Sequence, residues 1–317
     1  MPRFAFLALT ITLAPPVGAS DFMLELPIDC TLGQTCYIQN YVDRAPGPGM
    51  SDYQCGGLGY DGHKGTDFAL PSLADMERGV NVLAAAPGVV RGMRDGVPDI
   101  GPTDATAGQE CGNGVVLRHE GGWETQYCHM KSGSASVKTG QRVDAGAILG
   151  QVGLSGKTQF PHLHLSVRHN GKVTDPFDLS AISACGESGE TLWQDAPDYL
   201  AGGLLQSGFS TTVPEYDTVK AGTADQSPLA ATAPALVFWA YAYGGQKGDI
   251  VALTIDGPDG RVVDHKTTLS KDQAQFFRAA GKRLKTAEWP NGDYLGVATL
   301  TRNGAEYARF EQAMTIR

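Results

Sequence analysis

The sequence has little charge for its length and lacks the hallmarks of several protein classes. Only 19% of its 317 residues are charged, and acidic side chains outnumber basic ones by 34 to 25, for a formal net charge of −9. Nucleic acids call for a basic face, so this balance argues against such a partner. No long run of like charge is present, and no apolar run is long enough to cross a bilayer. We expect neither a nucleic-acid partner nor a transmembrane segment.

The first residues carry the pattern of a secretory signal peptide. One arginine precedes an apolar run from Phe4 to Leu13, and small residues follow up to Ala19. This order is specific for export signals and favours that interpretation over an N-terminal core strand. The residue directly after the expected cleavage site at Ala19 is not a cysteine, which argues against a lipid anchor. We therefore expect an exported protein, periplasmic or secreted.

Six cysteines are an even number, which fits disulfides in an exported chain. Cys111 and Cys128 flank a stretch typical of a β-hairpin, so we expect them to pair. Spacing alone leaves other connectivities open for the remaining four. The simplest arrangement pairs Cys30 with Cys36 around a small loop and leaves Cys55 for Cys185.

Short apolar runs that end at Gly, Asn and Asp predict a mainly β protein. Up to about residue 198 they indicate an antiparallel sheet domain with few helices. Asn170-Gly171 is a two-residue hairpin signal, which gives His169 a role beside a turn. The segment 191–209 is expected to be a connection.

The pattern changes near residue 200. Apolar and polar residues then alternate with a period of two, and turns at Asp259-Gly260 and Asn303-Gly304 separate the runs. About a hundred residues of this pattern predict a small antiparallel β-sandwich. His265 is expected on its surface.

Three of the seven histidines fall in two short strings. In DGHKGTDF, His63 precedes Asp67 by one short turn, and the glycines argue against a regular helix. FPHLHLSV is typical of a strand on which His162 and His164 share one face. Burying two imidazoles without a partner is costly, so this second string is the more specific. One carboxylate and two imidazoles make a zinc set with a fourth position open, as in catalytic sites.

A fourth histidine lies in ETQYCHM, which is also typical of a strand. Alternation would turn Tyr127 and His129 to one face and Cys128 to the other. If His129 lines the site, Cys128 is expected to point away from it. That favours a disulfide for Cys128 over a role as a thiolate ligand.

GHKGTDF, YCHM and FPHLHLSV, in this order, resemble the three motifs of the lysostaphin-type zinc metallopeptidases, the LytM-domain peptidoglycan endopeptidases. AAAPGVV, GQRVDAGAILGQVG and TDPF also resemble this family around its central sheet. The resemblance covers about residues 55–180. It implies one Zn²⁺ per chain and hydrolysis of peptide bonds in the cross-links or stems of peptidoglycan.

The resemblance also assigns a role to each motif position. It implies that His63, Asp67 and His164 bind zinc. It implies that His162 and His129 lie beside the ion, where they orient or deprotonate water and stabilise the oxyanion. The sequence has no His-Glu-x-x-His string, so histidine is expected as the general base. Ser155 and Thr158, in GLSGKTQF, are expected to form a turn rather than to contact substrate.

Two rival functions remain open at this point. Some LytM-type domains bind or activate other cell-wall hydrolases without catalysis, and the five intact positions argue against that role here. A zinc peptidase that cleaves exported proteins fits the same motifs. The expected segments are a signal peptide over 1–19, an N-terminal extension over 20–54, a LytM-type zinc peptidase domain over 55–198 and an Ig-like β-sandwich over 199–317.

Two further segments have open roles. Residues 37–54 could cover the cleft or form a surface loop. The C-terminal domain could bind the cell wall, pack against the peptidase domain or contact a partner.

Overall fold

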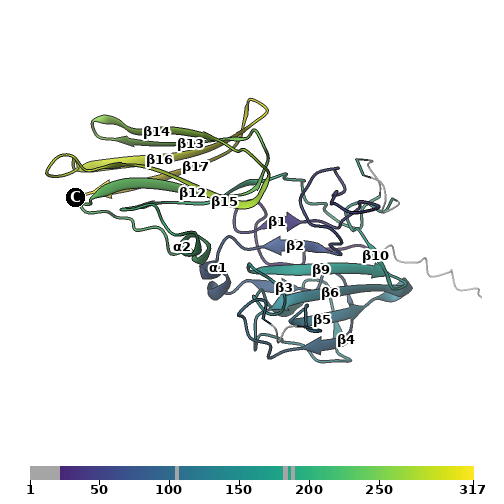
Figure 1. Cartoon of the computed structure of the whole chain (residues 1–317). Coiled ribbons are helices and arrows are strands. Elements are labelled where there is room, and N and C mark those ends of the chain that lie inside the picture. Colours follow the sequence, from purple (N-terminus) through teal and green to yellow (C-terminus); the bar gives the residue numbers. More distant parts are fainter. Residues whose placement is uncertain (1–21, 104–106, 181–184, 187–189) are drawn as a thin grey trace, which may run out of the picture.

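The computed structural model describes residues 22–103, 107–180, 185–186 and 190–317. It is mostly antiparallel β, as the sequence predicts, with two lobes side by side (Figure 1). The expected signal peptide lies outside the described residues. Within the described ranges, no helix is long and apolar enough to cross a membrane.

The first lobe is built on one large antiparallel sheet. Its strands follow the order β1-β2-β9-β6-β5-β4-β7, and β10 pairs with β9 beyond this path. A two-stranded sheet, β3 with β8, lies beside it, and α1 (Leu73–Arg78) follows β2. The bounds are β1 Tyr37–Asn40, β2 Thr66–Ala69, β3 Asn81–Leu83, β4 Gly88–Arg94, β5 Asn113–Arg118, β6 Trp123–Met130, β7 Arg142–Val143, β8 Ile148–Gln151, β9 His162–His169 and β10 Lys172–Thr174.

The segment expected as a separate extension, 20–54, is part of this first lobe over its described residues. β1 pairs with β2 and so extends the large sheet. Leu24, Ile28 and Tyr41 are almost fully buried in the same apolar core as the strands of the motifs. Residues beyond the motif region therefore help to hold the sheet that carries it.

The second lobe consists of two antiparallel sheets that pack face to face (Figure 1). One has the order β11-β12-β15 and the other β14-β13-β16-β17. The short helix α2 (Tyr216–Ala221) follows β11. The bounds are β11 Gly203–Ser210, β12 Ala235–Gly245, β13 Ile250–Gly257, β14 Gly260–Thr268, β15 Gln273–Arg283, β16 Gly292–Arg302 and β17 Ala305–Ile316.

Most turn signals lie where the sequence places them. Asn170-Gly171 and Asn303-Gly304 have the positive φ angles of a tight hairpin turn. The turn expected at Asp259-Gly260 is shifted by one residue, because Gly260 already pairs with Gly257. The segment expected as a connection over 191–209 ends early, since β11 begins at Gly203.

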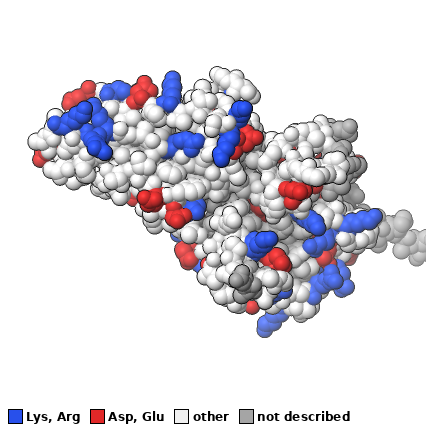
Figure 2. Space-filling view, in the orientation of Figure 1, with Lys and Arg blue, Asp and Glu red and all other residues white. Residues whose placement is uncertain are grey.

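The face in Figure 2 carries lysines and arginines interspersed with acidic side chains on both lobes. The three expected disulfide pairs are all present: Cys30–Cys36, Cys55–Cys185 and Cys111–Cys128. The second of these joins residues that are far apart in the sequence. Closing so long a loop removes conformations from the unfolded chain.

His119 is a buried histidine of the first lobe that lies outside the motifs. Its Nδ1–H donates to the carbonyl of Pro87 at 2.8 Å, and its Nε2 lies 2.8 Å from Oγ1 of Thr125. Burial lowers the pKa of His119, although the Pro87 carbonyl opposes this. The unfolded chain therefore takes up a proton at this side chain at a higher pH than the folded protein does.

We predict that His119 makes the fold less stable in acid. The free energy of unfolding should fall as the pH drops below about 6.5, the pKa of histidine in the unfolded chain. This group contributes at most about 1.4 kcal/mol per pH unit to that fall. His119→Gln keeps a donor and an acceptor but does not titrate, so its slope of unfolding free energy against pH should be shallower. Urea unfolding of metal-free protein between pH 5 and pH 7 measures this, with a substitution of the exposed His265, His265→Gln, as control. Equal slopes in His119→Gln and the parent would contradict the assignment.

Candidate metal centre

Three side chains of the two motifs meet in the first lobe. Nε2 of His63 lies 3.2 Å from Oδ1 of Asp67 and 3.2 Å from Nδ1 of His164. Nδ1 of His164 lies 2.8 Å from the same Oδ1. The three donor atoms thus form a compact triangle, and the side chains form a group able to hold a metal ion.

Strand pairing creates this triangle. β2 and β9 are neighbours in the sheet, and Asp67 is directly opposite His164 in their register. Side chains of opposed residues lie on the same face, so the carboxylate and the imidazole meet. His63 joins them from the turn just before β2. Gly65 in that turn has no room for a side chain, because a Cβ atom there would lie 2.6 Å from Nε2 of His164.

β1 completes the surroundings of the triangle. The carbonyl of Tyr41, just after β1, accepts a hydrogen bond from Nδ1 of His63 at 2.7 Å. A carbonyl only accepts, so Nδ1 carries a proton, and Nε2 of the neutral ring keeps its lone pair for the site. Nδ2 of Asn40 donates to Oδ2 of Asp67 at 2.7 Å, which leaves Oδ1 facing the histidines.

The donor set fits zinc. Two imidazole nitrogens and one carboxylate oxygen are usual zinc ligands at about 2.0–2.2 Å, which places tetrahedral ligands on the order of 3.3 Å apart. The observed separations of 2.8–3.2 Å are close to this spacing. Three protein ligands also leave a fourth tetrahedral position for water or substrate, as in catalytic zinc sites.

Burial and mutual charge set the protonation of the triangle. Burial opposes the charge of Asp67, but the facing His162 and His63 hold its pKa well below the usual range. Burial lowers the pKa of His164, partly offset by its hydrogen bond to Asp67. For His63, burial is outweighed by Asp67, and the pKa is raised. The carboxylate is therefore ionised, as a metal ligand must be.

Two more histidines lie beside the triangle. The ring centroids of His129 and His162 are 4.6 Å apart, and that of His129 is 6.1 Å from that of His164. Nε2 of His162 lies 3.4 Å from Oδ1 of Asp67. Burial lowers the pKa of His129 to about 3, and the nearby His162 and His164 contribute. His129 is therefore a neutral imidazole at neutral pH.

The loop before β9 orients both of these rings. Nδ1 of His129 donates to the carbonyl of Ser155 at 2.8 Å. Nδ1 of His162 lies 3.0 Å from the carbonyl of Phe160 and 3.1 Å from Oγ1 of Thr158. The neutral form of each ring therefore keeps its lone pair on Nε2. Ser155 and Thr158 were expected only to form a turn, yet they also position the histidines.

The structure corrects the expected orientation of Cys128. Cys128 is opposite His164 in the register of β6 and β9, so it lies on the site face, and Tyr127 lies on the core face opposite Leu165. A β-bulge puts an extra residue into β6 against β5, and His129 within it has a positive φ of 62°. The bulge turns His129 to the site against strict alternation. The disulfide expected for Cys128 is nevertheless present.

A cleft of about 810 Å³ opens over these side chains. Asp67, His129, His162 and His164 line it together with the Cys111–Cys128 pair. Its rim includes residues of the second lobe, which the motifs could not indicate. These are Tyr216 from α2 and Ala274 and Gln275 from β15.

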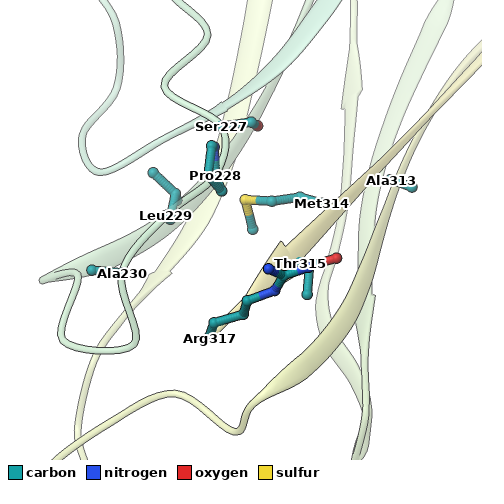
Figure 3. A pocket seen from close by; sticks show the side chains of 8 residues that line it. All are labelled: Ser227, Pro228, Leu229, Ala230, Ala313, Met314, Thr315 and Arg317. Carbon is teal, nitrogen blue, oxygen red and sulfur yellow. The ribbon is translucent and has the colours of Figure 1, made fainter.

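A second hollow of about 600 Å³ lies in the second lobe between the loop of Ser227–Ala230 and the end of β17 (Figure 3). Met314 points into it, and Arg317 is its only charged lining residue. No histidine or acidic side chain lines it, so it offers no metal ligands of the kind found in the cleft. The chemistry-bearing side chains thus gather in the larger cleft.

Residues 61–176 match the sequence model of Peptidase family M23, the LytM-type family that the motifs resemble. This range holds all five histidine and aspartate positions described above. The chain is 32% identical over 120 residues to the DD-carboxypeptidase/endopeptidase Mpg of Neisseria meningitidis, which covers 37% of this chain and 23% of that protein. It is 31% identical over 137 residues to the Peptidoglycan DD-endopeptidase ShyC of Vibrio cholerae, covering 42% and 27%.

Other similar proteins have different names or are solved structures. The Cell division protein DipM of Caulobacter vibrioides is 34% identical over 98 residues, 31% of this chain and 14% of that protein. The catalytic domain of a mutant of the prophage-encoded M23 protein EnpA of Enterococcus faecalis aligns with 24% identity and a TM-score of 0.33, covering 49% of this chain and 95% of that one. The chain spans about a quarter or less of the curated relatives it matches.

We predict that the two histidines of β9 respond differently to substitution. His164→Ala removes one corner of the donor triangle, so zinc content should fall far below one ion per chain. His162→Ala leaves the triangle intact and should keep its zinc, while any hydrolysis slows by about 10²–10⁴-fold. Elemental analysis of both folded variants, alongside their rates, measures this. Loss of zinc from His162→Ala with retention in His164→Ala would reverse the two roles.

Proposed function

We propose that the M23 domain of this chain is a zinc endopeptidase that hydrolyses peptide bonds in the cross-links or stems of peptidoglycan. The donor triangle of His63, Asp67 and His164 is the observation that carries this proposal. The match of residues 61–176 to a peptidase family supports it. Relatives named as endopeptidases acting on peptidoglycan support the choice of substrate.

His63, Asp67 and His164 would hold one Zn²⁺ through Nε2, Oδ1 and Nδ1. When bound there, zinc lowers the pKa of a coordinated water towards 7 and polarises a peptide carbonyl. The protein keeps each donor atom free for this purpose. The carbonyl of Tyr41 fixes the tautomer of His63, and Asn40 occupies the second oxygen of Asp67.

His129 and His162 are proposed to move the protons. Each is held through Nδ1 by a carbonyl of the loop 155–160, so Nε2 is the basic atom. A neutral imidazole at this position accepts a proton from water and can return it to the leaving amine. When protonated, the same ring stabilises negative charge on the carbonyl oxygen. We assign the general base to this pair because the sequence offers no Glu-bearing zinc helix.

A regulatory role without catalysis is the principal alternative, and one relative is named for cell division rather than for hydrolysis. The intact donor triangle and the two oriented histidines favour catalysis. Cleavage of exported proteins is the second alternative, since the site selects a peptide bond and not its side chains.

The same proposal places the protein in the periplasm or outside the cell. Three disulfides fit an oxidising compartment, and peptidoglycan lies in that compartment. The N-terminal signal-peptide pattern agrees with export.

Digestion of purified peptidoglycan tests the activity. Protein loaded with zinc should release fragments with new amino termini, which mass spectrometry locates on the peptide part. Chelation should abolish release, and added Zn²⁺ should restore it. His164→Ala at equal concentration is the matched control. Undiminished release by rigorously metal-free protein would disprove the zinc mechanism, and cleavage of unfolded proteins without release from peptidoglycan would favour the second alternative.

A further inference from the structure

The second lobe contributes directly to the cleft of the first. Tyr216, Ala274 and Gln275 line it on the side of the second lobe, and Gln39 and Phe160 line it on the first. In Figure 1, β15 lies beside β1, and α2 lies beside α1, at the junction of the lobes. The cleft is therefore shared by two parts of the chain that are far apart in sequence.

The junction of the lobes is an apolar interface rather than a loose contact. Tyr37 of β1 and Ala69 of β2 share a buried cluster with aromatic side chains of β12. The rings of Tyr37 and Tyr243 have centroids 4.4 Å apart. The other buried members are Leu205, Val219, Ala224, Trp239 and Tyr241. An interface of this kind holds two domains in one orientation.

Hydrogen bonds fix the part of the interface that borders the cleft. Nε2 of Gln275 donates to the hydroxyl of Tyr37 at 2.8 Å and to Oε1 of Gln39 at 3.1 Å. Oε1 of Gln275 accepts from the hydroxyl of Tyr241 at 2.9 Å. Nε2 of Gln39 donates to the carbonyl of Ala274 at 3.3 Å. The border is thus held by side chains from both lobes.

An aromatic contact links this interface to the proposed catalytic pair. Phe160 packs against the interface cluster and also stacks on His162, with ring centroids 4.5 Å apart and planes 25° apart. Tyr216 packs on the same cluster and stacks on Phe277 at 5.6 Å. The ring of Tyr216 is therefore held in place while it remains partly exposed to the cleft.

We infer that the second lobe is a fixed wall of the substrate cleft, and that Tyr216 and Ala274 bind the part of an extended peptide that continues beyond the bond being cut. A pre-positioned aromatic ring gains contact with a peptide at little entropic cost, and a wall held by hydrogen bonds limits the width of the chain that fits. The substrate class is an extended peptide several residues long. This inference rests on the proposed peptidase function.

Steady-state kinetics of Tyr216→Ala test the inference. The substrates are a long cross-linked peptide from a peptidoglycan digest and a short peptide that contains little more than the bond cut. Loss of binding that is equal in ground and transition states raises KM without changing kcat. For the long substrate we expect KM to rise on the order of tenfold and kcat to stay within about twofold. The values for the short peptide and the zinc content should match those of the parent.

Two further variants make the test specific. Tyr307→Ala removes a tyrosine that is 38% exposed in the same lobe and does not line the cleft, so its KM should equal that of the parent. Ala274→Trp adds bulk at an exposed residue of the wall, which should raise KM for the long peptide even if Tyr216→Ala folds poorly. Thermal melting identifies any folding defect.

The outcomes separate this inference from the proposed function. If the parent cleaves the long peptide but neither Tyr216→Ala nor Ala274→Trp changes its KM, the wall is not a binding surface and the peptidase assignment stands. If the parent cleaves nothing, the peptidase assignment fails. Calorimetric binding of the long peptide to metal-free protein then decides the inference, which requires weaker binding by both variants than by Tyr307→Ala.

Discussion

The pairing of β2 with β9 is the constraint on which the site depends. It puts the carboxylate of Asp67 opposite His164 in the middle of a sheet, where Asp67 is only 2% exposed. An ionised carboxylate at such a position is very unfavourable unless partners surround it. Three histidines and an asparagine provide those partners, and this is why so many polar side chains gather at one point of an apolar core.

The scaffold around this point comes from separate parts of the chain. β1 supplies Asn40, and Tyr41 follows it directly, although neither belongs to a motif or to the region matched by the M23 family. The loop 155–160 supplies the carbonyls that select the tautomers of His129 and His162. The side chains of the site are thus oriented by backbone carbonyls and by the side chain of Asn40.

The same N-terminal strand joins the two lobes. Asn40 on β1 and the adjacent Tyr41 hydrogen-bond to the donor triangle. Tyr37 and Gln39 on β1 contact the second lobe. A shift of the second lobe would therefore disturb the strand that positions Asp67. The apolar interface holds the two lobes together, and residues of both lobes line the cleft.

The sequence by itself determined the class of the fold and the turns at Asn170-Gly171 and Asn303-Gly304, which depend on local rules: period-two alternation and glycine at positive φ. The grouping of His63, Asp67 and His164 followed from the resemblance of the motifs to the LytM-type family. Local rules failed at Cys128, because the bulge that reorients His129 depends on the pairing of β6 with β5. Only the tertiary structure decided that Asn40, Tyr41 and Tyr216 border the site, since contacts between distant segments follow from how sheets pack and leave no periodic signal in the sequence.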